Sequence, residues 1–339
     1  MNRIISFAIT SLFLTASGAV LAGQDQPEPL KSESNIERML KDRRVMEVII
    51  KTENNPLDIA MTEDGGTIYV THHFPGKISE ISENKVVRTK YFGKNLTGIA
   101  LTRDEKTLYV GVGGEDYVAV IDAKTFEVTK KIPTGKWPLG VRISRDGRWL
   151  ATCCYLSNSV YLISTSTYET KEIKAGTNPF YLAISRDSKR IYATNYGSAN
   201  LSVISVETDL GDLKANNMHA KVIKTVKVGN GPVGVALTAD GKLVYTANYS
   251  EASVSAISTE SLEIEQIIKV GVNPYFIGAS PENSFVMVSN YGSNHVDVIY
   301  ANERTTVEVK NATTNIYVSP NGKRIFTSNY TNHYVGVIE

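Results

Sequence analysis

The chain has 339 residues, of which 42% are hydrophobic and 21% are charged, so it is a globular sequence long enough for a large core. Its 36 basic and 35 acidic residues almost cancel, which excludes a global positive field of the kind that holds nucleic acid. We therefore do not expect nucleic acid as a partner.

The N-terminal end has the pattern of an export signal. A short basic start, ending at Arg3, precedes an uncharged apolar stretch from Ile4 to Val20, and small residues follow. This order is typical of a secretory signal peptide over residues 1–22, cut after Ala22; the alternative is a membrane anchor, because about 18 apolar residues approach spanning length. Cleavage would remove one base and no acid, leaving 35 of each. We expect a periplasmic or secreted protein with no membrane span after cleavage.

The next segment, residues 23–45, is a polar N-terminal extension that contains two prolines. We expect it to be partly disordered, with a short helix over residues 35–44. A repeat array begins at residue 46.

Each repeat unit has the same order of elements. An Asn-Pro or Gly-Pro pair opens it, and a short apolar strand, an Asp-Gly turn and a second strand ending in Asn-Tyr follow. A third strand of alternating Val and Ile and a fourth strand ending in Gly complete the unit. Asp-Gly between β-branched and aromatic runs is a hairpin signal, so each unit is predicted to be a four-stranded antiparallel sheet.

Counting the units gives the architecture. The residue that ends the second strand recurs at spacings of 40, 42, 41, 53, 42 and 39, at positions His72, Val112, Cys154, Asn195, Asn248, Asn290 and Asn329. Seven units of four short strands predict an all-β, seven-bladed β-propeller over residues 46–339. The long spacing predicts an insertion at about 207–221 in blade four, as an extended hairpin or loop. A parallel solenoid is the weaker alternative, because its repeats are usually about 20–30 residues.

The ends of the array predict how the ring closes. The last unit stops at residues 334–339, its third strand, so its fourth strand is missing. Residues 49–56 match residues 267–274, which are a fourth strand followed by an opening proline. We therefore expect an N-terminal strand to complete the last blade and remove its exposed edge.

The units resemble those of the YVTN-repeat β-propeller family, named for a Tyr-Val-Thr-Asn motif. Residues 69–72, Tyr-Val-Thr-His, are the nearest copy and depart from the motif at the last residue. The resemblance covers about residues 46–339 and implies an exported protein of bacterial type. Many members of this family have no known activity, some relatives bind nucleic acid, and related propellers include sugar-lactone hydrolases and haem-binding subunits. The fold alone does not choose among them.

The predicted topology places candidate residues on one face. The loops before the first strand and after the second strand open on the same side of a blade, so the Asn-Pro and Asn-Tyr pairs share one rim around the channel. Aromatic rings and amides suit recognition, although Asn can instead bond its own turn and Tyr can pack between blades. The expected ligand- or partner-binding residues are Trp137, Tyr155, Phe180, Tyr181, Asn195, Tyr196, Asn248, Tyr249, Tyr275, Asn290, Tyr291, Asn329 and Tyr330.

Two residue pairs break the repeat on this rim. His72 and His73 could contribute to a metal site, or they could be exposed loop histidines, since no His-x-His or Cys-x-x-Cys spacing supports the metal. Cys153 and Cys154 could form a vicinal disulfide in an oxidising compartment. Otherwise they are two strand residues that face opposite ways.

Catalytic motifs are absent from the sequence. It has no Gly-x-Ser-x-Gly, no His-Glu-x-x-His and no phosphate-binding glycine loop. Asp58 and Asp116 lie near the rim and could pair or bind a cation. We expect a monomeric, exported, non-enzymatic binding or scaffold propeller that presents the Asn/Tyr rim to a protein or small-molecule ligand, with no cofactor strongly implied. The alternatives are a metal-dependent lactonase or lyase and an accessory protein that binds a redox cofactor.

Overall fold

The structure is a computed structural model that describes residues 47–208, 218–293, 295–300, 303–309 and 313–338. The expected signal peptide, the extension over residues 23–45 and the middle of the predicted insertion lie outside the described residues. No helix in the part that is described is long and apolar enough to cross a membrane.

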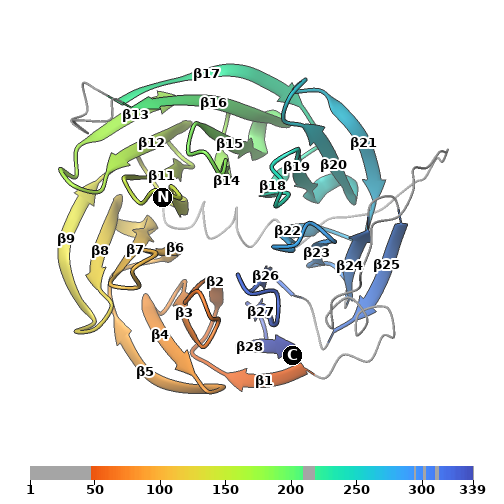
Figure 1. The fold of residues 1–339 in the computed structure, drawn as a ribbon. Helices are drawn as coiled ribbons and strands as arrows, with labels where there is room; N and C mark the ends of the chain where they lie inside the picture. Colours follow the sequence, from red (N-terminus) through yellow and green to blue (C-terminus); the bar gives the residue numbers. More distant parts are fainter. Residues whose placement is uncertain (1–46, 209–217, 294, 301–302, 310–312, 339) are drawn as a thin grey trace.

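Seven four-stranded antiparallel sheets surround a central axis, which confirms the predicted seven-bladed β-propeller (Figure 1). The blades are β2 (Pro56–Met61), β3 (Thr67–His72), β4 (Lys77–Ser82) and β5 (Lys85–Tyr91) in blade one; β6 (Leu96–Leu101), β7 (Thr107–Val112), β8 (Tyr117–Asp122) and β9 (Glu127–Pro133) in blade two; β10 (Pro138–Ile143), β11 (Trp149–Cys154), β12 (Ser159–Ser164) and β13 (Thr170–Lys174) in blade three; and β14 (Pro179–Ile184), β15 (Arg190–Asn195), β16 (Asn200–Thr208) and β17 (Met218–Lys227) in blade four. The others are β18 (Pro232–Leu237), β19 (Leu243–Asn248), β20 (Ser253–Ser258) and β21 (Ile264–Lys269) in blade five; β22 (Pro274–Ala279), β23 (Val286–Asn290), β24 (His295–Tyr300) and β25 (Glu303–Glu308) in blade six; and β26 (Asn315–Val318), β27 (Ile325–Asn329), β28 (Tyr334–Ile338) and β1 (Glu47–Lys51) in blade seven.

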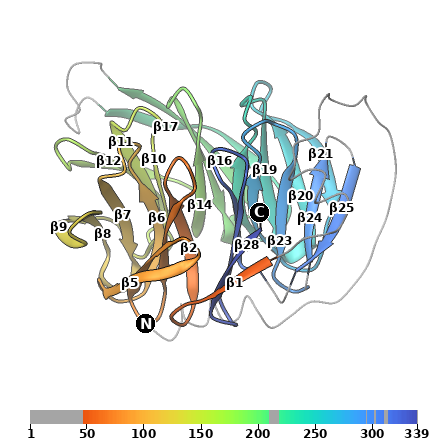
Figure 2. The same ribbon diagram turned by 60° about the horizontal axis from the view of Figure 1, so that its bottom comes forward.

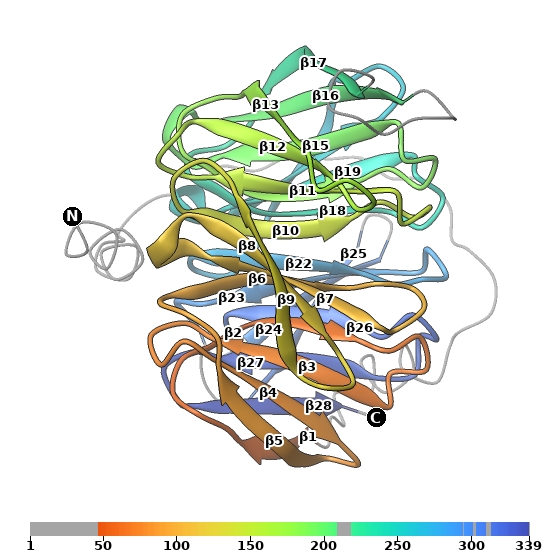
Figure 3. The same ribbon diagram turned by 90° about the vertical axis from the view of Figure 1, so that its left-hand side faces the viewer.

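Three short 3-10 helices, η1 (Gly113–Glu115), η2 (Tyr196–Ser198) and η4 (Tyr249–Glu251), follow second strands. In blades one to six the strand order follows the chain, so the first strand is innermost and the fourth is outermost, whereas in blade seven β26 is innermost and β1 is outermost (Figure 1). In the side view the strands run roughly along the ring axis, so the innermost strands connect the two faces (Figure 3). We call the face after the second strands the rim face, and the face with the hairpin turns the Asp-Gly face.

The last blade closes the ring as the sequence predicts. β1 pairs antiparallel with β28, with Ile50 opposite Val335 and Lys51 opposite Tyr334 (Figure 2). The side chains of Ile50 and Val335 are buried in an apolar cluster shared by blades seven and one. The first strand of the array is therefore the outer strand of its last sheet.

Burial explains the residue pattern of the strands. The second strands are buried along nearly their whole length, as in β11 and β23, because both faces of each sheet pack against neighbouring blades. The outer strands alternate or are mostly exposed, as in β5 and β9. Most of the core therefore lies between blades, and each blade depends on its neighbours.

Blade four carries the predicted insertion. β16 and β17 pair from Asn200 opposite Lys227 to Thr208 opposite Met218, which makes them the longest strands described. The pairing extends into the predicted insertion, and the residues that join the two strands lie outside the described part.

Candidate functional site

The second strands of blades four to seven end in asparagine, and in blades four and five its side-chain amide bonds within the blade. In blade four, Asn195 Nδ2 donates to Ser202 Oγ at 2.9 Å, and in blade five, Asn248 Nδ2 donates to Ser255 Oγ at 2.9 Å. In each case the acceptor lies seven residues later, on the third strand. The four repeat asparagines, Asn195, Asn248, Asn290 and Asn329, are all 0% exposed. The amides of Asn195 and Asn248 therefore hold strands together, and burial keeps all four from being presented to a ligand.

Blades six and seven vary the same bond. Asn290 Nδ2 donates to Asp297 Oδ2 at 3.0 Å, again seven residues later. The equivalent acceptor position of Asn329 is Gly336, and the buried amide of Asn329 has no hydrogen-bond partner. A Cβ at Gly336 would lie 2.0 Å from Glu47 Oε1 and 2.4 Å from Thr327 Oγ1, so a side chain there would require both of these side chains to shift.

The two rim histidines lie inside the fold, where each bonds to a neighbouring strand or loop. His72 takes the place of the repeat asparagine, and its Nε2 bonds Ser79 Oγ at 2.9 Å, seven residues later. His73 Nδ1 bonds the carbonyl of Leu96 at 2.8 Å. Both rings are buried, which lowers the pKa of each to about 4. Among the described residues, no group of three or more His, Cys, Asp or Glu side chains could hold a metal ion. Each ring uses one nitrogen for a bond inside the fold, and its other nitrogen, Nδ1 of His72 or Nε2 of His73, is buried without a hydrogen-bond partner.

The two adjacent cysteines are free thiols in the structure. They end β11, where Cys153 lies opposite Val160 and Cys154 opposite Ser159. Consecutive residues of a regular strand point to opposite faces, so a vicinal disulfide is not formed. Burial raises the pKa of the Cys154 thiol to about 12 and that of Cys153 well above its ordinary value.

Aromatic side chains do converge on the rim face. The residue after each second-strand end is, in blade order, His73, Gly113, Tyr155, Tyr196, Tyr249, Tyr291 and Tyr330. Ring-to-ring contacts within 6.4 Å link Tyr155, Phe180, Tyr196, Tyr249, Tyr275 and Tyr291 into one group, and His73, Phe74, Trp137 and Tyr330 into another. We call these ten residues the aromatic rim. In blade two the Trp137 ring fills the place of the missing side chain, since a Cβ at Gly113 would lie 3.2 Å from Trp137 Cε2.

The aromatic rim is a packed layer of rings, whereas the sequence analysis expected these residues to be presented to a ligand or partner. Trp137, Tyr155, Tyr249, Tyr275 and Tyr330 are all buried, because the rings cover one another at the mouth of the channel. Tyr196 and Tyr291 are half-buried, and Phe74, which the sequence analysis did not select, is 46% exposed. The surface offered on this face is therefore made by a few protruding rings above a packed layer.

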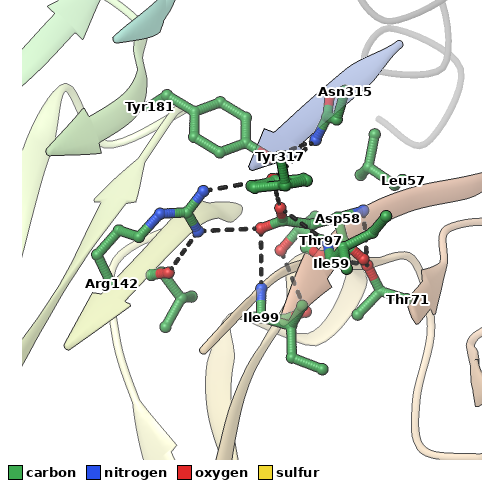
Figure 4. Close-up of polar contacts among 12 residues, drawn as sticks. Leu57, Asp58, Ile59, Thr71, Thr97, Ile99, Arg142, Tyr181, Asn315 and Tyr317 are labelled. Carbon is green, nitrogen blue, oxygen red and sulfur yellow. Dashed lines mark hydrogen bonds and ion pairs between the residues drawn. The ribbon is translucent and has the colours of Figure 1, made fainter. Parts of the chain in front are cut away.

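Beneath this layer, residues of four blades meet across the ring axis (Figure 4). Asp58 comes from blade one, Arg142 from blade three, Tyr181 from blade four, and Asn315 and Tyr317 from blade seven. We call these five residues the axial cluster. Blades one and three are not neighbours, and neither are blades four and seven, so the contacts among them cross the axis.

Asp58 is the acceptor at the centre of the cluster. Its Oδ1 accepts from the Ile59 amide at 3.0 Å and from the Tyr317 hydroxyl, and its Oδ2 accepts from the Ile99 amide at 3.0 Å and from Arg142 Nη1 at 3.1 Å. The Asp58 side chain is 0% exposed. Each of its oxygens already accepts two hydrogen bonds, so this carboxylate is saturated.

Arg142 keeps unused hydrogen-bonding capacity. Nη1 also donates to the Val141 carbonyl at 2.8 Å, while Nη2 reaches only the Tyr317 hydroxyl at 3.4 Å. The guanidinium lies over the Tyr181 ring, 5.3 Å from its centroid. Although burial opposes its charge, the carboxylate of Asp58 raises the pKa of Arg142, so the group stays protonated. The Arg142 side chain is 23% exposed, whereas that of Asp58, the other charged group of the cluster, is 0% exposed.

Two tyrosines and one amide complete the cluster. Asn315 Nδ2 donates to the hydroxyls of Tyr181 and Tyr317, each at 3.2 Å. Burial, with the nearby Asp58 carboxylate, raises the pKa of both phenols well above the ordinary value. Both hydroxyls therefore remain neutral. Tyr181, expected on the rim, belongs instead to this deeper layer.

The sequence carried a signal for the axial cluster. The residue before the last of each innermost strand is small in five blades, namely Ala60, Ala100, Ala183, Ala236 and Gly278, and only Arg142 and Tyr317 depart from this. Asp58 was singled out with Asp116, but the two do not pair. Asp116 Oδ1 instead accepts from the Trp137 amide at 2.9 Å, on the rim face.

The fold defines this chain as a seven-bladed β-propeller with four-stranded blades. A model of the YNCE-like β-propeller family matches residues 86–337, more than half of the chain, and the chain belongs to that family.

Hydrazine synthase and two lyases are among the proteins that are similar to this chain. Hydrazine synthase subunit beta of Kuenenia stuttgartiensis is 26% identical over 166 residues, covering 35% of this chain and 43% of that protein, so the match spans less than half of that relative. The solved Kuenenia stuttgartiensis hydrazine synthase has a TM-score of 0.71 at 21% identity, covering 86% of this chain and 97% of that one. A streptogramin B lyase has a TM-score of 0.71 at 15% identity, covering 87% and 97%. A virginiamycin B lyase from Staphylococcus aureus has a TM-score of 0.72 at 14% identity, covering 87% and 98%. These structural likenesses show the fold.

Proposed function

We propose that the protein is an exported, non-enzymatic propeller that docks a partner protein on the aromatic rim. The exposure of Phe74 carries this proposal. Its ring is 46% exposed, while its other side contacts His73 at 4.8 Å and Tyr330 at 6.3 Å between ring centroids. A phenyl ring held on a packed aromatic layer is a preformed anchor, because little conformational entropy is lost when a partner covers it.

Other features support a protein partner. Tyr196 and Tyr291 protrude on the same face, half-buried, so the exposed anchors are spread over several blades. Tyrosine and phenylalanine are enriched at protein interfaces, where they supply apolar area and a hydroxyl together. The similar hydrazine synthase chain is a subunit, so that relative belongs to an assembly of chains. Export rests on the N-terminal pattern of residues 1–22.

The enzyme alternatives have less support in the residues. A lactonase or lyase site at the rim would need His72 or His73 to reach a ligand, and both rings are buried and bonded. Likeness to the lyases is a likeness of fold.

The test is crosslinking of the protein in its native periplasm with a lysine-reactive reagent, followed by identification of the crosslinked peptides. Lys94 and Lys136 are exposed in rim-face loops and should carry the crosslinks to the partner. The double variant Phe74→Ser, Tyr196→Ser should lose the partner. The matched control Val87→Ser, which removes a 60% exposed side chain from the outer strand β5, should keep it.

Two outcomes would contradict the proposal. One is a folded double variant that retains the same crosslinked partner. The other is a set of crosslinks that maps only to outer strands. Trp137→Ala is unsuitable for this test, because Trp137 is 5% exposed and its truncation would cost about 3–5 kcal/mol of stability.

A further inference from the structure

The side chains of the axial cluster are more exposed to solvent toward the Asp-Gly face than toward the rim face. Asp58 and Asn315, near the rim-face ends of their strands, are 0% exposed. Arg142 and Tyr317, two residues further along the innermost strands, are partly exposed. The last residues of these strands are half-buried in every blade, whereas the first residues are buried. Solvent therefore reaches the guanidinium of Arg142 from the Asp-Gly side.

The donors of Arg142 exceed the acceptors around it. A guanidinium has five N–H groups. Nη1 uses its two on Asp58 and Val141, Nη2 makes one long bond to Tyr317, and Nε makes no hydrogen bond to a described residue. A planar guanidinium that has free N–H groups and is partly exposed to solvent is suited to binding a carboxylate or a phosphate.

Three more arginines stand at the same end of the ring. Arg103, Arg145 and Arg186 each follow an innermost strand by two residues, in the consecutive blades two, three and four. All three side chains are exposed, and none makes a hydrogen bond or ion pair to a residue in the described ranges. The equivalent residue of blade one is Glu63, so the arc of positive charge covers one side of the axis.

The aspartate next to each of these arginines accepts hydrogen bonds within its own turn. Asp104 accepts from Thr102 Oγ1, Asp146 from Ser144 Oγ and Asp187 from Ser185 Oγ, each at 2.6 Å. Each of the three carboxylates also accepts the backbone amide two residues later. Their orientation toward the turn leaves the neighbouring guanidinium groups without a partner.

We propose that the Asp-Gly end of the ring axis binds a small oxyanion, a carboxylate or a phosphate. Arg142 is the recognition group at its base, and Arg103, Arg145 and Arg186 supply the attracting charge around it. The saturated Asp58 fixes the guanidinium of Arg142 and does not itself contact the anion. This site lies on the face opposite the aromatic rim, so it stands independently of the docking role proposed above.

Isothermal titration calorimetry at low ionic strength tests the proposal, with inorganic phosphate and succinate as separate probes on the mature protein. Binding of phosphate alone would identify a phosphate-type ligand, and binding of succinate alone a carboxylate. The triple variant Arg103→Gln, Arg145→Gln, Arg186→Gln should weaken binding about tenfold or more, because it removes three positive charges that are weakly screened at low ionic strength. Arg142→Lys keeps the positive charge beside Asp58 and removes the planar guanidinium with its paired N–H donors, so it should also weaken binding.

The control removes the same three charges from outer strands, as Lys85→Gln, Lys227→Gln, Lys269→Gln, all at exposed positions. It should keep affinity within about twofold, since these charges lie outside the site. Equal losses in the two triple variants would overturn the proposal, as would the absence of binding by either probe at millimolar concentration. Unchanged affinity in a folded Arg142→Lys variant would overturn the role of Arg142.

Discussion

Replacing Asp58 with Asn should destabilise the whole ring. The substitution keeps the shape of the side chain and removes the charge that Arg142 faces at 3.1 Å, while the amides of Ile59 and Ile99 and the hydroxyl of Tyr317 compete for one remaining oxygen. Breaking a buried ion pair from one side costs about 3–5 kcal/mol. Because Arg142 is 23% exposed, water screens part of its uncompensated charge, and we expect a loss near the lower end, about 3 kcal/mol.

The assay is urea and thermal unfolding of the single variants Asp58→Asn and Arg142→Gln and of the double variant. A loss of this size should lower Tm by roughly 6 °C, at about 2 °C per kcal/mol for a large domain. The two amides of the double variant can bond each other, so it should be more stable than the sum of the single losses predicts, by about 1–3 kcal/mol. A loss below about 1 kcal/mol in Asp58→Asn, or additive single losses, would refute the reasoning.

Two further predictions concern pH and thiol chemistry. Burial lowers the pKa of His72 and His73 to about 4, so their contribution to stability is fully present above the unfolded pKa of about 6.5 and is lost as pH falls toward 4, by roughly 3 kcal/mol for each ring. His72→Asn restores the amide that bonds the third strand in blades four and five, and it should remove about half of this acid-side decline in Tm; identical slopes for the variant and the wild type would contradict this. The raised pKa values and burial of Cys153 and Cys154 should leave both thiols unmodified by iodoacetamide until the protein unfolds. Rapid alkylation of the native protein, seen by mass spectrometry, would count against the buried strand geometry.

The repeat made the fold predictable. The period, the hairpin turns and the missing last strand specified seven blades and the closure by residues near Ile50, because each of these depends on local sequence pattern. The sequence predicted which residues lie at the rim, but it did not predict how far their side chains are exposed. Asn195 and Tyr155 do lie where the topology places them, but burial depends on how rings from neighbouring blades cover one another.

The axial cluster was harder to anticipate. Asp58 was noticed as a carboxylate near the channel, yet its partner Arg142 lies 84 residues later in a blade that is not adjacent. No local pattern joins them, and only the aligned column of small residues broken by Arg142 and Tyr317 pointed there. At His72 the sequence analysis suggested a functional role where the structure shows a hydrogen bond within the blade. Its chemistry suggested a ligand, whereas its position in the repeat assigned it the structural bond of the asparagines.

The pairing of β1 with β28 has a consequence for how the chain folds. Residues 47–51 pair with residues 334–338, so the sheet that joins them has the longest sequence separation among the described sheets. Blades one to six each need only consecutive strands, whereas β1 has no partner until the last blade forms. Contacts between such distant segments are slow to form because the loop-closure entropy is lost before they stabilise the chain. A partly folded chain therefore carries an unpaired strand at one end, which is a site where a chaperone or a second copy of the chain can bind before the ring is closed.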